Sequence, residues 1–372
     1  MIQLTSITLR EIRLPLKEPF RISSGVVSER RIALLELHDA SGASTWSECV
    51  AGETPNYSPE TIDTAWLAIS EWLAPRVIGR KIGSPGDVLP MLEEDIRGHL
   101  MAKAAIEMGI WGIEATQLGM PLSRLLGGTR HEIDVGISLG IQKTPDELAT
   151  RVSAALKAGY RKVKIKIMPG SDVPFVRAAR EAVGMAAPLM ADANNAYTLD
   201  DVDHLRDLDE LGLMMIEQPL AWDDLVRHAE LQRHLQTPIC LDESITSLDR
   251  ARDMVALGSG RIVNIKPGRV GGLASSIAIH DFCESNGIPV WCGGMLESGI
   301  GRAYNVALAS LSNFVKPGDV SPSARYWERD IVTPEWTMNG NGTMTVPSTP
   351  GIGIDVDRDR VEDLTVREKK LS

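Results

Sequence analysis

Short apolar runs with strand character alternate with helical segments through the middle of the chain. Between residues 163 and 266 five such runs follow one another, and the stretches between them, such as 199–208 and 223–235, show helical periodicity. A strand and a helix that repeat about every 25 residues are typical of a (β/α) barrel, whose active site lies at the carboxyl ends of its strands. The pattern begins near residue 133, and its seventh strand spans 289–292.

The hydrophobic pattern before this repeat predicts a smaller α+β unit. Ser58 and Pro59 suit the start of a helix that runs to Trp72. A second helix runs from about Met101 to a glycine stop at Gly119. Strands are expected at 3–16, 31–37 and 44–50, with a loop at 15–27.

The chain length supports a barrel with a companion domain. At 372 residues the chain exceeds a minimal barrel of about 250 residues, but it is short for two full-sized catalytic domains. We expect an α/β fold with an α+β capping domain at 1–128 and a (β/α) barrel at 129–325. The segment 326–372 is rich in Gly, Pro and Asn, and we expect it to pack back on the capping domain.

Charge and composition exclude several kinds of partner. The formal net charge of −11 argues against nucleic acid and anionic membranes, because both bind clustered Lys and Arg. No stretch approaches the roughly 18 uninterrupted apolar residues of a membrane-spanning helix, and the first residues alternate as a strand rather than as a signal peptide. Cys240 and Cys292 lie in apolar strands, which favours buried reduced thiols. We expect a cytoplasmic protein.

Three carboxylates end successive strands at a constant interval of 25 residues: Asp192, Glu217 and Asp242. Acids that converge on one rim repel each other unless a cation lies between them, and hard oxygen ligands favour Mg²⁺. The alternative is that each acid only caps the helix that follows it. Asn194 and Glu243 follow closely in sequence, and they are candidate outer ligands of the same ion.

Lysines flank the carboxylates. Lys164 and Lys166 share one face of their strand with Lys162, whereas Val163 and Ile165 point to the other face, so the lysines are expected inside the barrel. Lys266 ends the sixth strand, diametrically opposite the second strand, which carries Lys166. Two bases that face each other across a metal-bound carboxylate could invert a carbon centre through a metal-stabilised enediolate. The alternative for these lysines is a set of structural salt bridges.

With these motifs the chain resembles the enolase superfamily, in its muconate-lactonising-enzyme subgroup. Within the subgroup it looks most like the N-succinylamino acid racemase / o-succinylbenzoate synthase family. That resemblance implies a modified (β/α)7β TIM barrel with an N-terminal α+β capping domain completed by the C-terminal segment. The matching pieces are Lys164-Ile165-Lys166, Asp192-Ala193-Asn194, 217–220, 241–244, 264–272, 291–302 and 317–319.

The resemblance also implies roles for individual residues. Lys166 and Lys266 would be the acid/base pair, and Lys164, Asn194 and Glu243 would assist. Asp192, Glu217 and Asp242 would bind Mg²⁺, for which Mn²⁺ or Co²⁺ could substitute. The small-molecule carboxylate substrate would be bound by Ser138, Gly293, Gly294, Met295, Tyr57 and Ser24. A homo-oligomer, between a dimer and an octamer, is expected.

Two positions depart from the family pattern. The resemblance implies an aromatic residue in the capping loop where this chain has Ser24, which changes the expected contact with the substrate side chain. Dipeptide epimerases of the same subgroup carry an Asp-x-Asp near the eighth strand, whereas here Ser321 follows Asp319 at the second position. The chain therefore lacks the second acid that would hold a free α-ammonium.

These residues allow more than one activity. The leading hypothesis is Mg²⁺-dependent racemisation of N-succinyl (N-acyl) amino acids by two-base 1,1-proton transfer, together with the syn dehydration that gives o-succinylbenzoate. Alternatives are o-succinylbenzoate synthase as the sole physiological activity, in menaquinone biosynthesis, and muconate cycloisomerase. The non-enzyme alternative is a catalytically silent metal-binding barrel.

Overall fold

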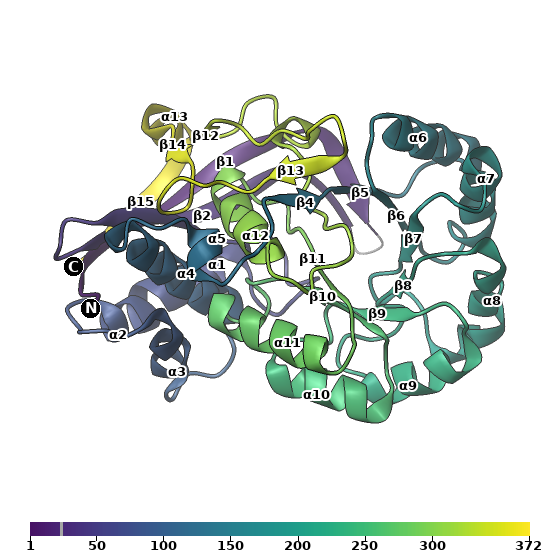
Figure 1. Cartoon of the computed structure of the whole chain (residues 1–372), viewed down its shortest axis with the longest axis horizontal. Helices are drawn as coiled ribbons and strands as arrows, with labels where there is room; N and C mark the ends of the chain where they lie inside the picture. Colours follow the sequence, from purple (N-terminus) through teal and green to yellow (C-terminus); the bar gives the residue numbers. More distant parts are fainter. Residues whose placement is uncertain (23–24) are drawn as a thin grey trace.

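The sheet of the capping domain is built from both ends of the chain. The computed structural model describes residues 1–22 and 25–372. Within them, β1 (Leu4–Ile22), β2 (Gly25–Asp39) and β3 (Ser44–Cys49) form an antiparallel sheet, and β15 (Thr365–Leu371) pairs with β1. Figure 1 shows both termini at the same end of the molecule. The predicted return of the C-terminal segment to the capping domain is confirmed.

Two local predictions for this domain are wrong. A loop is predicted at 15–27, but the described residues 15–22 and 25–27 belong to the strands β1 and β2, in which Phe20 lies opposite Val27 after a register shift. Ser23 and Ser24 lie outside the described residues. The helix predicted from Ser58 begins instead with α1 (Ile62–Leu67), because Thr61 forms a capping box that satisfies the first backbone N–H groups.

The helices of the capping domain cover one face of its sheet. After α1 the chain continues through a π-helical turn, and α4 (Leu100–Gln117) then packs on β2 and β3, with Leu35, Ile106 and Ile110 in one hydrophobic cluster. As predicted, this long helix stops before Gly119, which adopts a positive φ of 60°. The further elements are the π-helix (Ala68–Leu73), α2 (Ala74–Val77), α3 (Val88–Glu93), α4 (Leu100–Gln117) and α5 (Leu122–Leu125).

The second domain is the predicted barrel. Seven parallel strands pair in chain order within the described residues, and residues 318–319 close the gap between the last and the first. Gly136 N donates to Gly318 O at 2.7 Å, and Asp319 N donates to Cys292 O at 2.9 Å. The strands are β5 (Gly136–Leu139), β6 (Lys162–Lys166), β7 (Leu189–Asp192), β8 (Ile216–Glu217), β9 (Ile239–Leu241), β10 (Ile262–Ile265) and β11 (Val290–Cys292).

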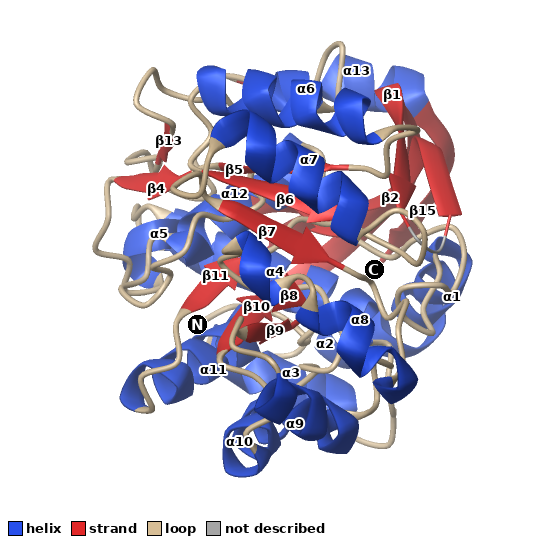
Figure 2. Cartoon of the chain, turned by 90° about the vertical axis from the view of Figure 1, so that its right-hand side faces the viewer, coloured by secondary structure: helices blue, strands red, loops and turns tan. Residues whose placement is uncertain are grey.

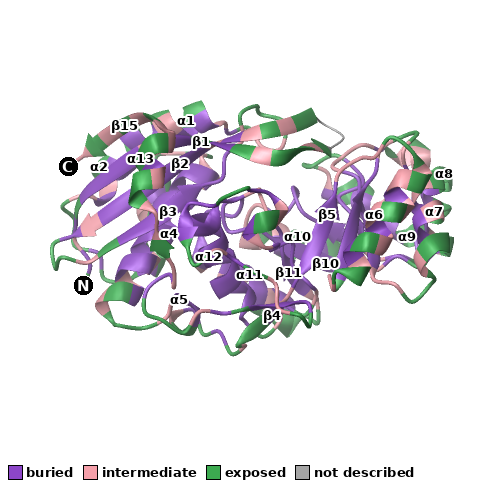
Figure 3. Ribbon diagram, turned by 90° about the horizontal axis from the view of Figure 1, so that it is seen from above, coloured by how far each residue is buried: buried purple, intermediate pink, exposed green. Residues whose placement is uncertain are grey.

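Helices surround these strands on the outside (Figure 2). Their outer faces are exposed, whereas the strands are buried (Figure 3). The stretch 199–208, predicted as one helix, is a 3₁₀ turn (Leu199–Asp201) followed by a short α8. The helices are α6 (Pro145–Lys157), α7 (Val173–Val183), α8 (Val202–Arg206), α9 (Leu225–His234), α10 (Leu248–Leu257), α11 (Leu273–Ser285) and α12 (Gly299–Ala309).

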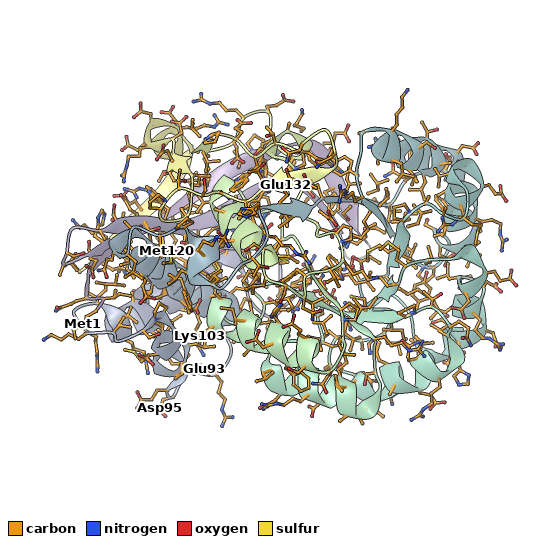
Figure 4. The ribbon with its side chains drawn as sticks, viewed as in Figure 1. Met1, Glu93, Asp95, Lys103, Met120 and Glu132 are labelled. Carbon is orange, nitrogen blue, oxygen red and sulfur yellow. The ribbon has the colours of Figure 1, made fainter. Side chains whose placement is uncertain are left out.

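Small antiparallel pairs and one helix complete the chain. One pair joins the entry to the barrel with the C-terminal segment, and α13 (Arg358–Leu364) leads into the last strand of the capping sheet. Side chains fill the ring enclosed by the barrel strands (Figure 4). These elements are β4 (Glu132–Asp134), β13 (Thr343–Thr345), β12 (Val332–Thr333), β14 (Asp355–Val356) and α13 (Arg358–Leu364).

Two buried glutamates of the capping domain fix it to the barrel. Glu107 on α4 accepts hydrogen bonds from Leu273 N at 2.8 Å and Ala274 N at 2.9 Å, at the start of α11. Glu48 on β3 accepts from Ser298 Oγ at 2.5 Å and Gly301 N at 3.0 Å, at the start of α12. Burial raises the pKa of each glutamate to about 7. Carboxylates of one domain thus cap helices of the other.

Replacing Glu107 by glutamine should change how stability depends on pH. The folded pKa of about 7 exceeds the ordinary value of 4.5, so the stability that comes from the protonated form is complete below 4.5 and is lost as the pH rises through 7. Between pH 5 and 8 the wild type should lose about 2–3 kcal/mol relative to Glu107→Gln. Urea unfolding of both proteins at the two pH values measures this. A difference that stays constant with pH would show that Glu107 does not titrate in this range.

Candidate active site

The predicted polar residues meet at the carboxyl ends of the barrel strands. Lys166 lies opposite Asp192 in the pairing of β6 with β7, and Asp192 lies opposite Glu217 in the next pair. Asp242 and Lys266 follow directly after β9 and β10. All five side chains are buried, with at most 9% of their surface exposed. The structure therefore brings together the residues that the strand pattern predicts to converge.

Lys164 and Lys166 project into the barrel among the acids. Lys166 Nζ lies 2.6 Å from Asp192 Oδ2 and donates to Asn194 Oδ1 at 2.7 Å. Lys164 Nζ lies 3.0 Å from both Asp192 Oδ2 and Glu217 Oε2. Burial opposes ionisation of Asp192, but the two lysine charges hold its pKa well below the usual range.

The facing side of the site is built around Asp242. Lys266 Nζ lies 2.8 Å from Asp242 Oδ2, and the Arg269 guanidinium contacts the other carboxylate oxygen. Burial would raise the pKa of Asp242, but these two cations lower it to about 2. Burial would lower the pKa of Lys266, but Asp242 raises it above its ordinary value, so the protonated form is favoured.

Tyr57 brings the capping domain into this cluster. Its hydroxyl donates to Asp242 Oδ1 at 2.9 Å and accepts from Arg269 Nη1 at 3.2 Å. Its ring lies over Lys266, with Nζ 4.5 Å from the ring centroid. The structure therefore places Tyr57 of the capping domain against Asp242, Lys266 and Arg269 at the mouth of the barrel.

The acids fit a divalent cation. Asp192, Glu217 and Asp242 are at most 1% exposed and offer only carboxylate oxygens, the hard donors that Mg²⁺ prefers. Burial raises the pKa of Glu217 well above its usual range, and the charge of Asp192 raises it further. Three buried carboxylates that offer only oxygen donors therefore have the chemistry of a site for a hard divalent cation.

The candidate outer ligands Asn194 and Glu243 lie next to each other. Asn194 Nδ2 donates to Glu243 Oε1 at 3.2 Å. Burial raises the pKa of Glu243 to about 7. Positive backbone φ angles, which residues other than glycine rarely adopt, occur at Asn194 (42°), Gln218 (38°) and Leu296 (57°). This strain lies at the ends of β7, β8 and β11, on the same rim as the acids.

The other residues predicted to contact the substrate differ in their packing and hydrogen bonding. Ser138 Oγ points into the barrel, is buried and has no hydrogen-bond partner within the described residues. Gly293 is required for packing, because a Cβ there would lie 2.3 Å from Asn264 Oδ1 and 2.6 Å from Lys266 Cε. A Cβ on Gly294 would lie 2.7 Å from a backbone oxygen. Met295 is half-buried against the capping-domain core.

Two site residues had no predicted role. Asn264 Nδ2 donates to Glu217 Oε1 at 2.7 Å. The period-2 argument that places Lys164 beside Lys166 also places Asn264 beside Lys266, so the signal was present in the sequence. Arg269 follows its strand in a turn, where no periodicity indicates which way a side chain points.

A second group of possible metal ligands lies on α11, at His280, Asp281 and Glu284. Its histidine is already hydrogen-bonded through both ring nitrogens: Nδ1 lies 2.8 Å from Asp281 Oδ1, and Nε2 accepts from Asn313 N at 2.9 Å. Glu284 accepts a hydrogen bond from Ser312. This group is a hydrogen-bonded cluster on an outer helix and does not take part in the barrel site.

The sequence matches known proteins over nearly its full length. Residues 4–127 match the mandelate racemase / muconate lactonizing enzyme N-terminal domain, and residues 147–360 match the enolase C-terminal domain-like family. An o-succinylbenzoate synthase from Geobacillus kaustophilus is 51% identical over 98% of this chain and 96% of that protein. An N-succinylamino acid racemase from Thermus thermophilus is 46% identical over 98% of each. An enolase superfamily member from Listeria innocua superposes with a TM-score of 0.96 at 39% identity, over 100% of this chain and 99% of that one.

Fold and site together define a barrel with an N-terminal capping domain and a buried group of lysines and acids at the carboxyl ends of its strands. The chain belongs to the enolase superfamily, in its mandelate racemase / muconate lactonizing enzyme group. It is an enzyme of the isomerase and lyase classes that its close relatives represent. The family predicted from the motifs is confirmed. Among the helices of residues 1–22 and 25–372, none is long and apolar enough to cross a bilayer.

Proposed function

We propose that this enzyme racemises N-succinyl (N-acyl) amino acids and also carries out the dehydration that gives o-succinylbenzoate. The observation that carries the proposal is that two buried lysines, Lys166 at the end of β6 and Lys266 directly after β10, contact different carboxylates of one group, Asp192 and Asp242. Relatives named for each activity match the chain at 51% and 46% identity, which supports both reactions.

Lys166 and Lys266 would exchange the α-proton from opposite faces of the substrate. β6 and β10 are separated by three strands of the barrel order, so the two ammonium groups enter the site from different sides. A proton removed by one lysine and returned by the other inverts the α-carbon. Because Asp242 favours the protonated form of Lys266, this residue is poised to donate when Lys166 abstracts.

Asp192, Glu217 and Asp242 would hold Mg²⁺. When bound, this ion supplies positive charge that stabilises the enediolate formed by α-proton removal. Lys164 lies among two of these acids and adds positive charge near the substrate carboxylate. Tyr57 and Arg269 orient Asp242 from the side of the capping domain. Burial of the whole group excludes water and strengthens these electrostatic contacts.

Dehydration begins with the same abstraction of an α-proton. One lysine would remove the α-proton and then return a proton to the hydroxyl group that departs as water from the same face. The other lysine, as a nearby cation, would stabilise the negative charge that develops. The site residues therefore serve both reactions, and substrate binding selects between them. Ser138, with its unpartnered hydroxyl inside the barrel, offers a hydrogen bond to the succinyl group.

The test measures both reactions on the same purified protein with Mg²⁺. Chiral chromatography follows interconversion of N-succinyl amino acids with small, branched and aromatic side chains, and ultraviolet absorbance follows formation of o-succinylbenzoate. We expect turnover in both assays. Absence of turnover in both would remove the proposed function, whereas turnover in only one would assign the enzyme to that activity.

A further inference from the structure

An ion cluster without an assigned role lies at the amino end of β6. Asp319, which closes the barrel, places its carboxylate between two buried lysines. Its Oδ1 lies 3.2 Å from Lys162 Nζ, and its Oδ2 lies 2.5 Å from Lys164 Nζ. Asp319 is 6% exposed, Lys162 0% and Lys164 3%, so solvent screens these charges very little.

The surroundings show a site built for the buried Lys162. Its Nζ lies 3.5 Å from the centroid of the Trp291 ring. Gly136 lies opposite it on β5, and a Cβ there would lie 2.9 Å from Lys162 Cε. Within the described residues Lys162 Nζ makes no hydrogen bond, so Asp319 and the ring compensate its charge. A buried ammonium with these neighbours attracts the Asp319 carboxylate and keeps it in place.

Lys164 connects this cluster to the candidate metal ligands. The ammonium that contacts Asp319 at 2.5 Å also lies 3.0 Å from both Asp192 and Glu217. An ammonium that stays close to these two acids competes with a metal ion for their oxygens and repels that ion. Asp319 attracts the same ammonium at a shorter distance than either of these acids, and its negative charge offsets the repulsion between that ammonium and a metal ion.

We propose that Asp319 is a positioning residue for the metal site. Its carboxylate holds the Lys164 ammonium toward the amino ends of the barrel strands, so that Asp192 and Glu217 stay available to a divalent cation. The Lys162 ammonium, 3.2 Å from Asp319 Oδ1, keeps the Asp319 carboxylate in this position. The inference rests on the metal site proposed above. Asp319 acts only through Lys164, and this distinguishes it from a ligand.

Direct titration of the purified protein with Mn²⁺, followed by electron paramagnetic resonance of the free ion, tests this role without any assay of activity. Asp319→Asn keeps the shape of the side chain and removes its charge. We expect it to raise the dissociation constant for Mn²⁺ about tenfold or more. In a Lys164→Met background the same substitution should change the constant by less than about twofold, because the competing ammonium is gone.

A matched control is Asp172→Asn. Asp172 is also a buried carboxylate, 2% exposed, but it caps α7 and accepts a hydrogen bond from Tyr197 at 2.9 Å. Its replacement should leave the affinity for Mn²⁺ unchanged. If Asp319→Asn fails to fold, the double variant Lys162→Met with Asp319→Asn replaces it, because neither position then carries a buried unpaired charge. This double variant should show the same weakened binding of Mn²⁺.

Three outcomes would contradict parts of this account, and they can be told apart. If wild-type protein binds no Mn²⁺, the proposed metal site itself is wrong. If wild type binds and the folded Asp319→Asn protein binds equally well, only the positioning role is wrong. If the substitution weakens binding equally with and without Lys164, then Asp319 acts on the metal directly, and the route through Lys164 is wrong.

Discussion

Replacing Lys166 by alanine should abolish proton exchange with one enantiomer of an N-succinyl amino acid and preserve measurable exchange with the other. Lys266→Ala should have the opposite preference. Lys166 contacts Asp192, whereas Lys266 contacts Asp242. Each lysine would therefore exchange only the α-proton that points toward it. A positioned acid or base contributes about 10²–10⁴-fold to a rate, so the loss for the affected enantiomer should lie in that range.

Exchange of the α-hydrogen in D₂O, followed by proton NMR for each pure enantiomer, measures this selectivity. Lys157→Ala, at an exposed position at the end of α6, is the control for loss of a lysine charge and should exchange both enantiomers at the wild-type rate. Dehydration should be slowed by both active-site substitutions. Loss of exchange with the same enantiomer in both variants would show that the two lysines do not act from opposite faces.

Removal of the metal should abolish activity, and Glu217→Gln should weaken metal binding at least about tenfold. Glu217 lies between the other two acids, and the substitution removes one negative charge from the group while keeping an oxygen donor. In the wild type, Lys164 Nζ lies 3.0 Å from a carboxylate oxygen of Glu217. In the variant, the side-chain NH₂ of the glutamine could face this ammonium instead of an oxygen. Activity after chelation should return with Mg²⁺ or Mn²⁺.

The matched control for this prediction is Glu107→Gln. Glu107 is equally buried and also has a raised pKa, but it caps α11 at the domain interface. It should bind metal like the wild type. Titration calorimetry with Mg²⁺ gives the affinities of all three proteins, and turnover is measured with and without excess EDTA. Full turnover in excess EDTA would exclude the metal from the reaction.

The strand pattern predicted the centre of the site, because the alternation of residues along a strand determines which face each side chain points to. Alternation along β6 places Lys164 and Lys166 on the inner face, since Val163 and Ile165 belong to the hydrophobic core outside the strand. Equal spacing of strand ends brings the three acids to one rim, because parallel strands present their carboxyl ends together. Fold class, barrel and inward lysines could therefore be predicted from local rules.

Contacts between segments far apart in the sequence could not be predicted in this way. Tyr57 reaches Asp242 across 185 positions, and Arg269 turns back onto the same carboxylate from a loop. Asp319 joins the lysine pair only because residues 318–319 close the barrel. Residues 15–22 and 25–27 are strand rather than the predicted loop, because Pro and Gly suggest turns locally, whereas pairing between β1 and β2 decides the conformation.

The most direct test of the central claim is proton NMR in D₂O of the wild-type enzyme with Mg²⁺ and each enantiomer of an N-succinyl amino acid in separate tubes. If Lys166 and Lys266 both exchange the α-proton, the Cα–H signal should disappear for both enantiomers, and each sample should gain the other enantiomer. A signal that persists in one enantiomer, or in both across the panel of side chains, would contradict two-base chemistry at this site.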